Sequence, residues 1–421
     1  MVADTRPLSV TAFRRLWTAN IVTVVGAQLT VVAVPAQIYA MTGSSAYVGL
    51  SGVFGLVPLI VFGLWGGALA DVMDRRTILW VTTIGLIVTS AAFWLQAAAG
   101  ADDVWLLLSL FAVQQAFFAV NQPTRSAVLP RLLPIELLPA ANALNTTVMQ
   151  AGAIAGPLVG GALIPVLGFS ALYFIDTCTL FATLWAVVRL PPMPIEGALG
   201  SAPGLRAVLD GFGYLRGHPL LLMSFVVDLI AMVFGMPRAL FPQVAHESFL
   251  GPTEGGVAFA LLFAGIPAGA VLGGIFSGWM SRIRRQGLAV VAAIAFWGVA
   301  MAGFGGAVGL APRARSLMLG AAVLSLVVGG AADMASSSFR NSMLMGAASD
   351  AVRGRLQGVF IVVVAGGPRI ADVLHGAAAP AAGTALTAAV GGVLVLVLLG
   401  VAVAAVPSFL QYRAPVASER R

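Results

Sequence analysis

Long apolar stretches alternate with short polar segments along the whole chain. Each apolar stretch holds about 20 residues or more, which is the length that an α-helix needs to cross the hydrocarbon core of a bilayer. The polar segments between them are short and contain arginine, as loops at a membrane surface often do. The pattern predicts twelve membrane-spanning helices, at 13–38, 44–70, 78–99, 105–127, 143–166, 169–190, 220–244, 255–280, 288–311, 316–339, 358–380 and 383–408.

The amino-acid composition agrees with this pattern. Hydrophobic residues make up 59% of the 421 residues and charged residues only 9%, and the mean hydropathy is +0.98. Soluble globular domains carry about 25% charged residues, so the sequence predicts an all-α membrane protein. The first apolar run follows a polar start without a cleavable signal-peptide pattern, and we expect it to remain as a membrane helix.

The arginines indicate an orientation. All 23 basic residues are arginine, and 19 of them, Arg340 included, fall in segments that face the cytoplasm if both termini do. This bias follows the positive-inside rule and predicts a multi-pass protein of the cytoplasmic (inner) cell membrane. It accounts for the net charge of +7 without a nucleic-acid partner. The expected parts are an N-terminal six-helix half (1–190), a cytoplasmic central loop (191–219), a C-terminal six-helix half (220–408) and a cytoplasmic tail (409–421).

A short polar turn separates the second and third predicted helices. Gly67 removes a side chain where a neighbouring helix can approach closely. Asp71 is expected where the next helix starts, because a carboxylate there accepts hydrogen bonds from free backbone N–H groups. Arg75 and Arg76 are expected to anchor the turn at an anionic membrane face. The turn is therefore a candidate gating element.

The fifth predicted helix carries small residues around a proline. Glycines at four-residue spacing give one smooth helix face for close packing in lipid. A proline can bend a membrane helix where neighbouring groups satisfy the freed carbonyl. The residues concerned are Gly152, Gly156, Pro157, Gly160 and Gly161.

Both runs resemble signatures of the major facilitator superfamily. The turn is similar to G-x-L-A-D-R-x-G-R-R, although Val72 replaces an arginine and Asp74 a glycine, which puts in doubt any ion pair built from that arginine. The helix matches G-x-x-x-G-P-x-x-G-G, which the superfamily shows mainly in exporters. Similar stretches recur in the second half with offsets of 274 − 67 = 207 and 368 − 157 = 211. The resemblance implies two pseudo-symmetric six-helix halves.

Within the superfamily, the chain is most similar to the enterobactin (siderophore) exporter branch. The stretches that carry this likeness are 32–38, 42–50, 130–134, 141–143 and 353–358.

Ionisable side chains inside predicted helices are costly and mark candidate functional sites. In the superfamily, helices 1, 4, 7 and 10 line a central cavity, so the resemblance makes Asp228 and Asp333 the first proton-coupling candidates. Asp372 is the third. It lies three residues after Arg369 on the same helix face. The two side chains either form a structural or gating ion pair or contact the substrate. His375 either extends this network or is a hydrogen-bonded packing residue.

Other polar side chains have less specific expectations. Asp176 is expected to be paired structurally or exposed at the outer interface, and Arg238 to snorkel or to attract an anionic ligand. Amides both donate and accept hydrogen bonds, which suits an oxygen-rich cargo, although some amides will only join helices. With Arg238, the substrate-cavity candidates are Gln28, Gln37, Gln114, Gln115 and Asn121.

The sequence gives no sign of an enzyme. A phosphate-binding loop needs a lysine, which the chain lacks, and its three histidines and one cysteine show no metal-ligand spacing. We therefore expect no cofactor and no metal.

The resemblance implies a secondary active exporter of a small amphipathic molecule, a siderophore or a hydrophobic drug. It would work by alternating access with proton antiport, as a monomer in the lipid bilayer. An importer of the same fold and a non-transporting membrane receptor or scaffold are the alternatives.

Overall fold

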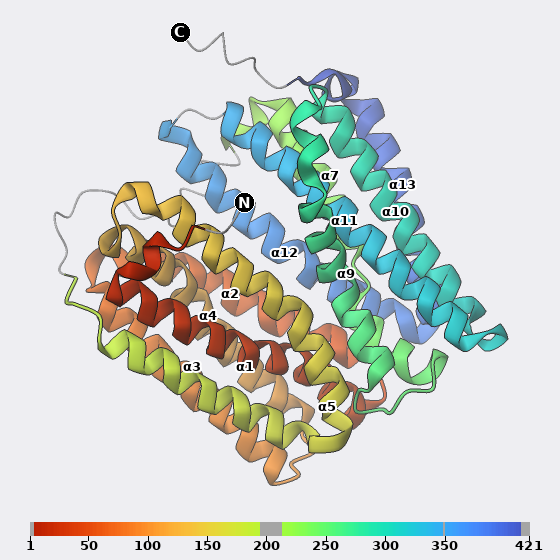
Figure 1. The fold of residues 1–421 in the computed structure, drawn as a ribbon. Helices are drawn as coiled ribbons and strands as arrows, with labels where there is room; N and C mark the ends of the chain where they lie inside the picture. Colours follow the sequence, from red (N-terminus) through yellow and green to blue (C-terminus); the bar gives the residue numbers. More distant parts are fainter. Residues whose placement is uncertain (1–3, 194–212, 348–349, 414–421) are drawn as a thin grey trace. The chain divides into compact units, whose positions relative to one another are not determined.

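The structure is a computed structural model that describes residues 4–193, 213–347 and 350–413, and every regular element among them is helical. Figure 1 shows the helices. In the element names that follow, η denotes a short 3-10 or π helix. In chain order the elements are η1 (Arg6–Ser9), α1 (Thr11–Thr42), α2 (Ser45–Val72), α3 (Arg75–Ala98), α4 (Val104–Leu132), η2 (Ile135–Leu137), α5 (Leu138–Val188), α7 (Pro219–Gly235), η3 (Arg238–Leu240), α8 (Phe241–Gln243), η4 (Val244–Ser248), α9 (Val257–Ile275), η5 (Ser277–Arg282), α10 (Gln286–Leu310), η6 (Ala311–Arg313), α11 (Arg315–Ala347), α12 (Asp350–Ala382), α13 (Thr384–Ala405) and η7 (Pro407–Gln411).

The helices agree with the predicted twelve crossings. Among the described residues, ten helical segments are long and apolar enough to cross a membrane. One of them contains α5, whose 51 residues extend about 76 Å at 1.5 Å per residue, more than twice a hydrocarbon core of about 30 Å. Gly168 (φ 72°, ψ 168°) breaks α5 into two crossings, in a conformation that glycine adopts easily. With α12, which has 33 residues, the total is 10 + 1 + 1 = 12.

The chain forms two compact units. Unit 1 comprises 1–43, 54–204 and 252–260, and unit 2 comprises 44–53, 205–251 and 261–421. In unit 1, α1 and α3 both pack against α5 (Figure 1). In unit 2, α10 packs against α11 and α13, and α7 packs against α12 and α13. The expected central loop lies mostly at 194–212, outside the described residues.

The α2–α3 turn corrects one prediction. Asp71 lies in the last turn of α2, which ends at Val72, and not at the start of the next helix. The N-cap of α3 is Asp74, whose Oδ1 accepts a hydrogen bond of 2.8 Å from the backbone N–H of Arg76. The capping carboxylate therefore lies three residues later than expected.

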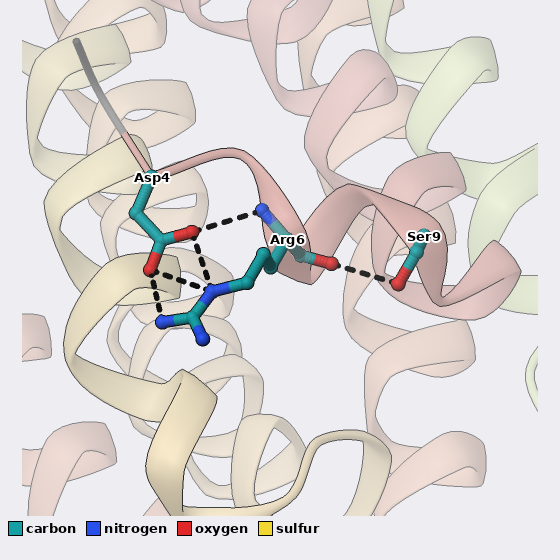
Figure 2. A network of polar contacts seen from close by, with 3 residues as sticks. All are labelled: Asp4, Arg6 and Ser9. Atoms are coloured by element: carbon teal, nitrogen blue, oxygen red, sulfur yellow. Dashed lines mark hydrogen bonds and ion pairs between the residues drawn. The ribbon is translucent and has the colours of Figure 1, made fainter.

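The first described residues form a small polar cluster ahead of α1, shown in Figure 2. The Arg6 guanidinium donates to both carboxylate oxygens of Asp4, with Nη2 2.7 Å from Oδ2, and Ser9 Oγ donates to the Arg6 carbonyl at 2.8 Å. These side-chain hydrogen bonds from Arg6 hold the pKa of Asp4 below its usual value. Both groups are exposed, so the pair orders the start of η1 and contributes little to overall stability.

Candidate functional site

The predicted gating turn is tied to two other helices of unit 1. Arg75 Nη1 donates to the Ala127 carbonyl of α4 at 3.0 Å, and Arg76 Nη2 donates to the Val188 carbonyl at 2.6 Å. Val188 is the last residue of α5, so Arg76 places a positive charge on a carbonyl at the negative end of that helix. Gly67 lies in α2 with Asp71, and the side chain of Asp71 is outside the described part of the chain.

The glycines of the α5 motif hold α1 at close range. A Cβ atom on Gly152 would collide with Val24, and one on Gly156 would collide with the Cβ of Gln28. A Cβ on Gly160 would lie 3.0 Å from Leu29 Cδ2. The three glycines therefore form the smooth face that their spacing predicts, and its partner is α1.

Gly161 makes a second close approach within unit 1. A Cβ there would lie 2.8 Å from the Ala260 Cα of α9, and the Gly161 carbonyl accepts a 2.8 Å hydrogen bond from the Gly256 backbone N–H. Pro157, next to these contacts, is buried within α5. The break in α5 lies eleven residues beyond it, at Gly168 (168 − 157 = 11).

Two predicted proton-coupling residues lie in one charged cluster in unit 2. Asp228 of α7 forms an ion pair with Arg340 of α11, with Oδ2 and Nη1 2.6 Å apart and the two side chains only 3% and 5% exposed. Arg340 Nε also donates to Ser336 Oγ at 3.2 Å. Asp333, on the same helix and partly exposed, interacts electrostatically with Asp228 and Arg340. The cluster holds two carboxyl groups and one guanidinium.

Arg340 was placed wrongly by the sequence reasoning. We expected it in a cytoplasmic loop, because the apolar run ends near residue 339, but α11 continues to Ala347 and Arg340 is buried within it. The signal that would have found it is spacing. Asp333, Ser336 and Arg340 lie three and four residues apart, on one face of a helix.

A second charged cluster in unit 2 contains Asp372. Its Oδ2 lies 3.5 Å from Arg238 Nη2 of η3, and its side chain is 5% exposed. Arg369, one turn earlier in α12, interacts electrostatically with both. His375 is buried, its Nδ1 hydrogen-bonds the Ala371 carbonyl at 2.9 Å, and it also interacts electrostatically with Asp372, so both expectations for it stay open.

The start of α2 packs on this part of α12. Its glycines allow the approach, because a Cβ on Gly49 would collide with the Asp372 carbonyl region and one on Gly52 with the Arg369 carbonyl. Ser45 Oγ, in the first turn of α2, donates to Gln243 Oε1 at 2.6 Å. The backbone of α12 at Arg369 and Asp372 is therefore in close contact with α2 within unit 2.

The amide candidates divide into two groups. Gln37 is buried and paired with Gln96, with amide nitrogen and oxygen atoms 3.1 and 3.3 Å apart. Asn121 is buried and donates to Thr82 Oγ1 at 2.8 Å. Both amides join helices within unit 1. The others are partly exposed, namely Gln28, Gln114 and Gln115.

Asp176 agrees with the first of its two expectations, structural pairing. It is 1% exposed, so it is not at an interface, and its hydrogen-bond donors are the hydroxyl groups of Thr30 and Ser90. Asp176 lies in the packed centre of unit 1 because it is on the face of α5 that packs against α1 and α3. The sequence alone did not determine that face.

Comparison with known sequences identifies the family. Residues 3–416 match the family described as transmembrane secretion effector. The enterobactin exporter EntS of Shigella boydii serotype 18 is 28% identical over 366 residues, which cover 87% of this chain and 84% of that protein. EntS of Escherichia coli O81 is 27% identical over the same length and coverage.

Solved structures show the same fold at low sequence identity. A single-residue mutant of the nucleoside transporter NupG has a TM-score of 0.75 and 14% identity, covering 93% of this chain and 99% of that one. A bacterial homologue of the human lysosomal transporter Spinster has a TM-score of 0.70 and 15% identity, covering 99% and 100%. Because the family match extends over nearly the whole chain, this protein belongs to the transmembrane secretion effector family of the major facilitator superfamily, and is a membrane transporter rather than an enzyme.

Proposed function

We propose that this chain is a secondary active exporter of a small amphipathic molecule, driven by proton antiport through alternating access. Similarity to EntS over 87% of the chain supports export and makes a siderophore the first cargo class to test, ahead of a hydrophobic drug. In this proposal both termini lie in the cytoplasm, and the monomer is the functional unit. Gly67, Asp71, Arg75 and Arg76 would form the inner gate.

The observation that carries proton coupling is the charge balance of the Asp228 cluster. Arg340 neutralises one carboxylate, and Asp228 is the carboxyl group in direct contact with it. Among the described residues, a second negative charge on Asp333 would then have no counter-charge of its own inside the membrane, where such a charge is costly. One proton completes the balance. We assign the carried proton to Asp333 and the role of holding Arg340 to Asp228.

The cluster gives a cycle in which one proton and one cargo molecule compete. With the proton bound, the cluster is neutral and unit 2 can move with little electrostatic cost. When the cluster opens to the cytoplasm the proton leaves, and cargo binding then favours the return step. Because the proton enters from outside, its gradient drives cargo outward.

The test measures whether the protein, reconstituted in proteoliposomes, moves cargo against the cargo's own concentration gradient when a pH gradient is imposed. Enterobactin serves as the anionic probe and a lipophilic cationic dye as the drug-like probe. Asp333→Asn and Asp228→Asn should lose concentrative transport of the preferred cargo while downhill exchange remains. Asp102→Asn, at an exposed loop position, is the matched control and should behave as wild type.

Two results would overturn the proposal. If Asp228→Asn and Asp333→Asn both still concentrate cargo in response to a pH gradient, coupling lies elsewhere, and Asp372 is the next candidate. If the wild-type protein moves neither probe in either direction, the receptor or scaffold alternative is favoured. Accumulation that runs only inward would identify an importer.

The second charged cluster favours anionic cargo. Arg238 is the more exposed member of its ion pair with Asp372, with 34% of its side chain accessible, so its guanidinium can also contact an anionic group of the cargo. A cationic drug would meet the positive charge of Arg238 at this point. Arg238→Gln should therefore raise the KM for an anionic catecholate several-fold and leave the KM for an uncharged analogue nearly unchanged. Equal changes for both probes would assign Arg238 a structural role.

A further inference from the structure

A buried carboxyl group joins three helices in unit 1. Asp176 of α5 is 1% exposed. Its Oδ2 accepts a 2.7 Å hydrogen bond from Thr30 Oγ1 of α1 and a 3.0 Å hydrogen bond from Ser90 Oγ of α3. Thr177 Oγ1 donates to Ser90 Oγ at 3.1 Å and so holds the second donor in place. One carboxyl oxygen therefore accepts hydrogen bonds from hydroxyl groups on two neighbouring helices.

The other oxygen of Asp176 has no hydrogen-bond partner. Among the described residues, Oδ1 is one of four buried side-chain atoms in this condition. It faces Gly26 of α1, where a Cβ atom would lie 2.9 Å from Oδ1 and 2.8 Å from the Asp176 Cα. The missing side chain at Gly26 is what makes room for the carboxyl group between the two helices.

No positive charge on α1, α3 or α5 is within reach of this carboxyl group. The basic residues of α1 and α3 are in their first turns, and Thr30 and Ser90 lie 15 and 14 residues further along than Arg15 and Arg76. At 1.5 Å per residue these separations are about 20 Å. Arg189 comes one residue after the end of α5. The titratable or charged side chains on the three helices, apart from Asp176, are Arg14, Arg15, Tyr39, Arg75, Arg76, Tyr173 and Cys178.

Tyr173, one turn before Asp176, already has a partner. Its hydroxyl donates to Gln37 Oε1 at 2.9 Å, and its ring stacks on Phe93 with centroids 5.1 Å apart. The Gln37 amide is itself paired with Gln96. The network around Asp176 thus consists of neutral hydroxyl and amide groups, and none of these contacts supplies a counter-charge.

An ionised carboxylate in this position would be expensive. Two neutral hydrogen bonds offset only part of the loss of hydration, and an uncompensated buried charge costs several kcal/mol. A proton or a cation would remove the charge. A hard cation needs about six or more oxygen ligands, whereas both hydroxyl donors here are already directed at Oδ2, and no group of three metal-binding side chains occurs among the described residues.

We propose that Asp176 is a proton-binding site in unit 1, occupied by a proton on the Oδ1 side while Thr30 and Ser90 hold Oδ2. The proton makes the carboxyl group neutral and allows α1, α3 and α5 to pack around it. Its release requires α1 to separate from α5 at Gly26, so the site is closed to exchange in the packed arrangement. This site is distinct from the Asp228 cluster and does not depend on transport being proton-coupled.

Infrared spectroscopy of the full-length protein in liposomes tests the site directly, because a protonated carboxyl group has a C=O stretch that a carboxylate lacks. At neutral pH the wild-type spectrum should contain a protonated component that Asp176→Asn removes and Asp102→Asn retains. Thr30→Val keeps the carboxyl group but deletes one hydrogen bond, so it should move that component to higher frequency. This second variant keeps the test valid if Asp176→Asn folds poorly.

Three outcomes would overturn the proposal. The first is a spectrum in which neither variant changes the protonated component. The second is a component that sodium ions remove at constant pH, which would assign a cation site instead. The third is an Asp176→Asn protein whose spectrum loses only carboxylate intensity, which would make Asp176 an ionised structural acceptor. Absence of cargo flux, by contrast, would count against the proposed export function and leave this site unaffected.

Discussion

Replacing Arg340 by alanine should strongly destabilise unit 2. Its Nη1 lies 2.6 Å from Asp228 Oδ2, and the two side chains are only 5% and 3% exposed. Arg340→Ala leaves the Asp228 carboxylate buried without its partner, and breaking a buried pair from one side costs about 3–5 kcal/mol. The substitution also deletes the hydrogen bond from Nε to Ser336 Oγ. We expect a loss of about 4 kcal/mol in the free energy of unfolding.

Removing both charges should restore part of this loss. Asp228→Asn together with Arg340→Gln leaves Asp333 as the only ionisable group of the cluster, and Asp333 is neutral when protonated, so no buried charge is left unpaired. A coupling energy of about 1–3 kcal/mol between the two positions is expected from a double-mutant cycle of residues in contact. The double variant should therefore be more stable than Arg340→Ala, although it cannot carry out proton coupling.

Equilibrium unfolding by SDS in mixed micelles, followed by tryptophan fluorescence, measures these free energies. Arg282→Ala is the matched control, because Arg282 is exposed in η5, and a surface substitution of this kind changes stability by about 0.5 kcal/mol or less. If Arg340→Ala unfolds at the same SDS fraction as Arg282→Ala, the buried ion pair does not stabilise the protein. A double variant less stable than Arg340→Ala would contradict the reasoning from unpaired charge.

Four further substitutions test the packing and the loops. Gly156→Ala should cost about 1–3 kcal/mol, because its Cβ would collide with Gln28 in a well-packed contact. Gly306→Ala, where nothing lies within 4 Å of the added atom, should be neutral or slightly stabilising in the same unfolding assay. Arg76→Ala should lower the melting temperature by a few degrees through loss of its bond to the last carbonyl of α5, and full retention of stability would refute the capping role. Arg6→Ala should leave the melting temperature unchanged, since it breaks only an exposed ion pair, and a large decrease would show that η1 supports the bundle.

The sequence predicted what depends on local pattern. Apolar runs of membrane-spanning length located the helices, and four-residue glycine spacing predicted the face of α5 that holds Gly156 against α1. Asp228 was recognised as a candidate because any carboxylate at membrane depth is unusual. Each of these inferences depends only on the sequence of a single helix.

What depends on contacts between distant segments was missed. The partner of Asp228 lies 340 − 228 = 112 residues later, and Arg340 looked like a loop arginine because the apolar run ended before it. Asp176 was expected either to be paired structurally or to be exposed at the outer interface, and only the packing of α1 and α3 on α5 decides for the buried, hydrogen-bonded alternative. Asp71 and Asp74 are both good capping residues, and only the end of α2 decides between them.

Movement of protons in response to cargo tests the central claim most directly. Proteoliposomes loaded with enterobactin and a trapped pH-sensitive dye start with equal pH on both sides, and external dilution imposes an outward cargo gradient. Antiport predicts that the lumen becomes acidic as cargo leaves, and that Asp333→Asn abolishes the acidification while cargo still exits. Cargo efflux from wild-type liposomes at constant internal pH, or with an alkaline change, would contradict proton antiport.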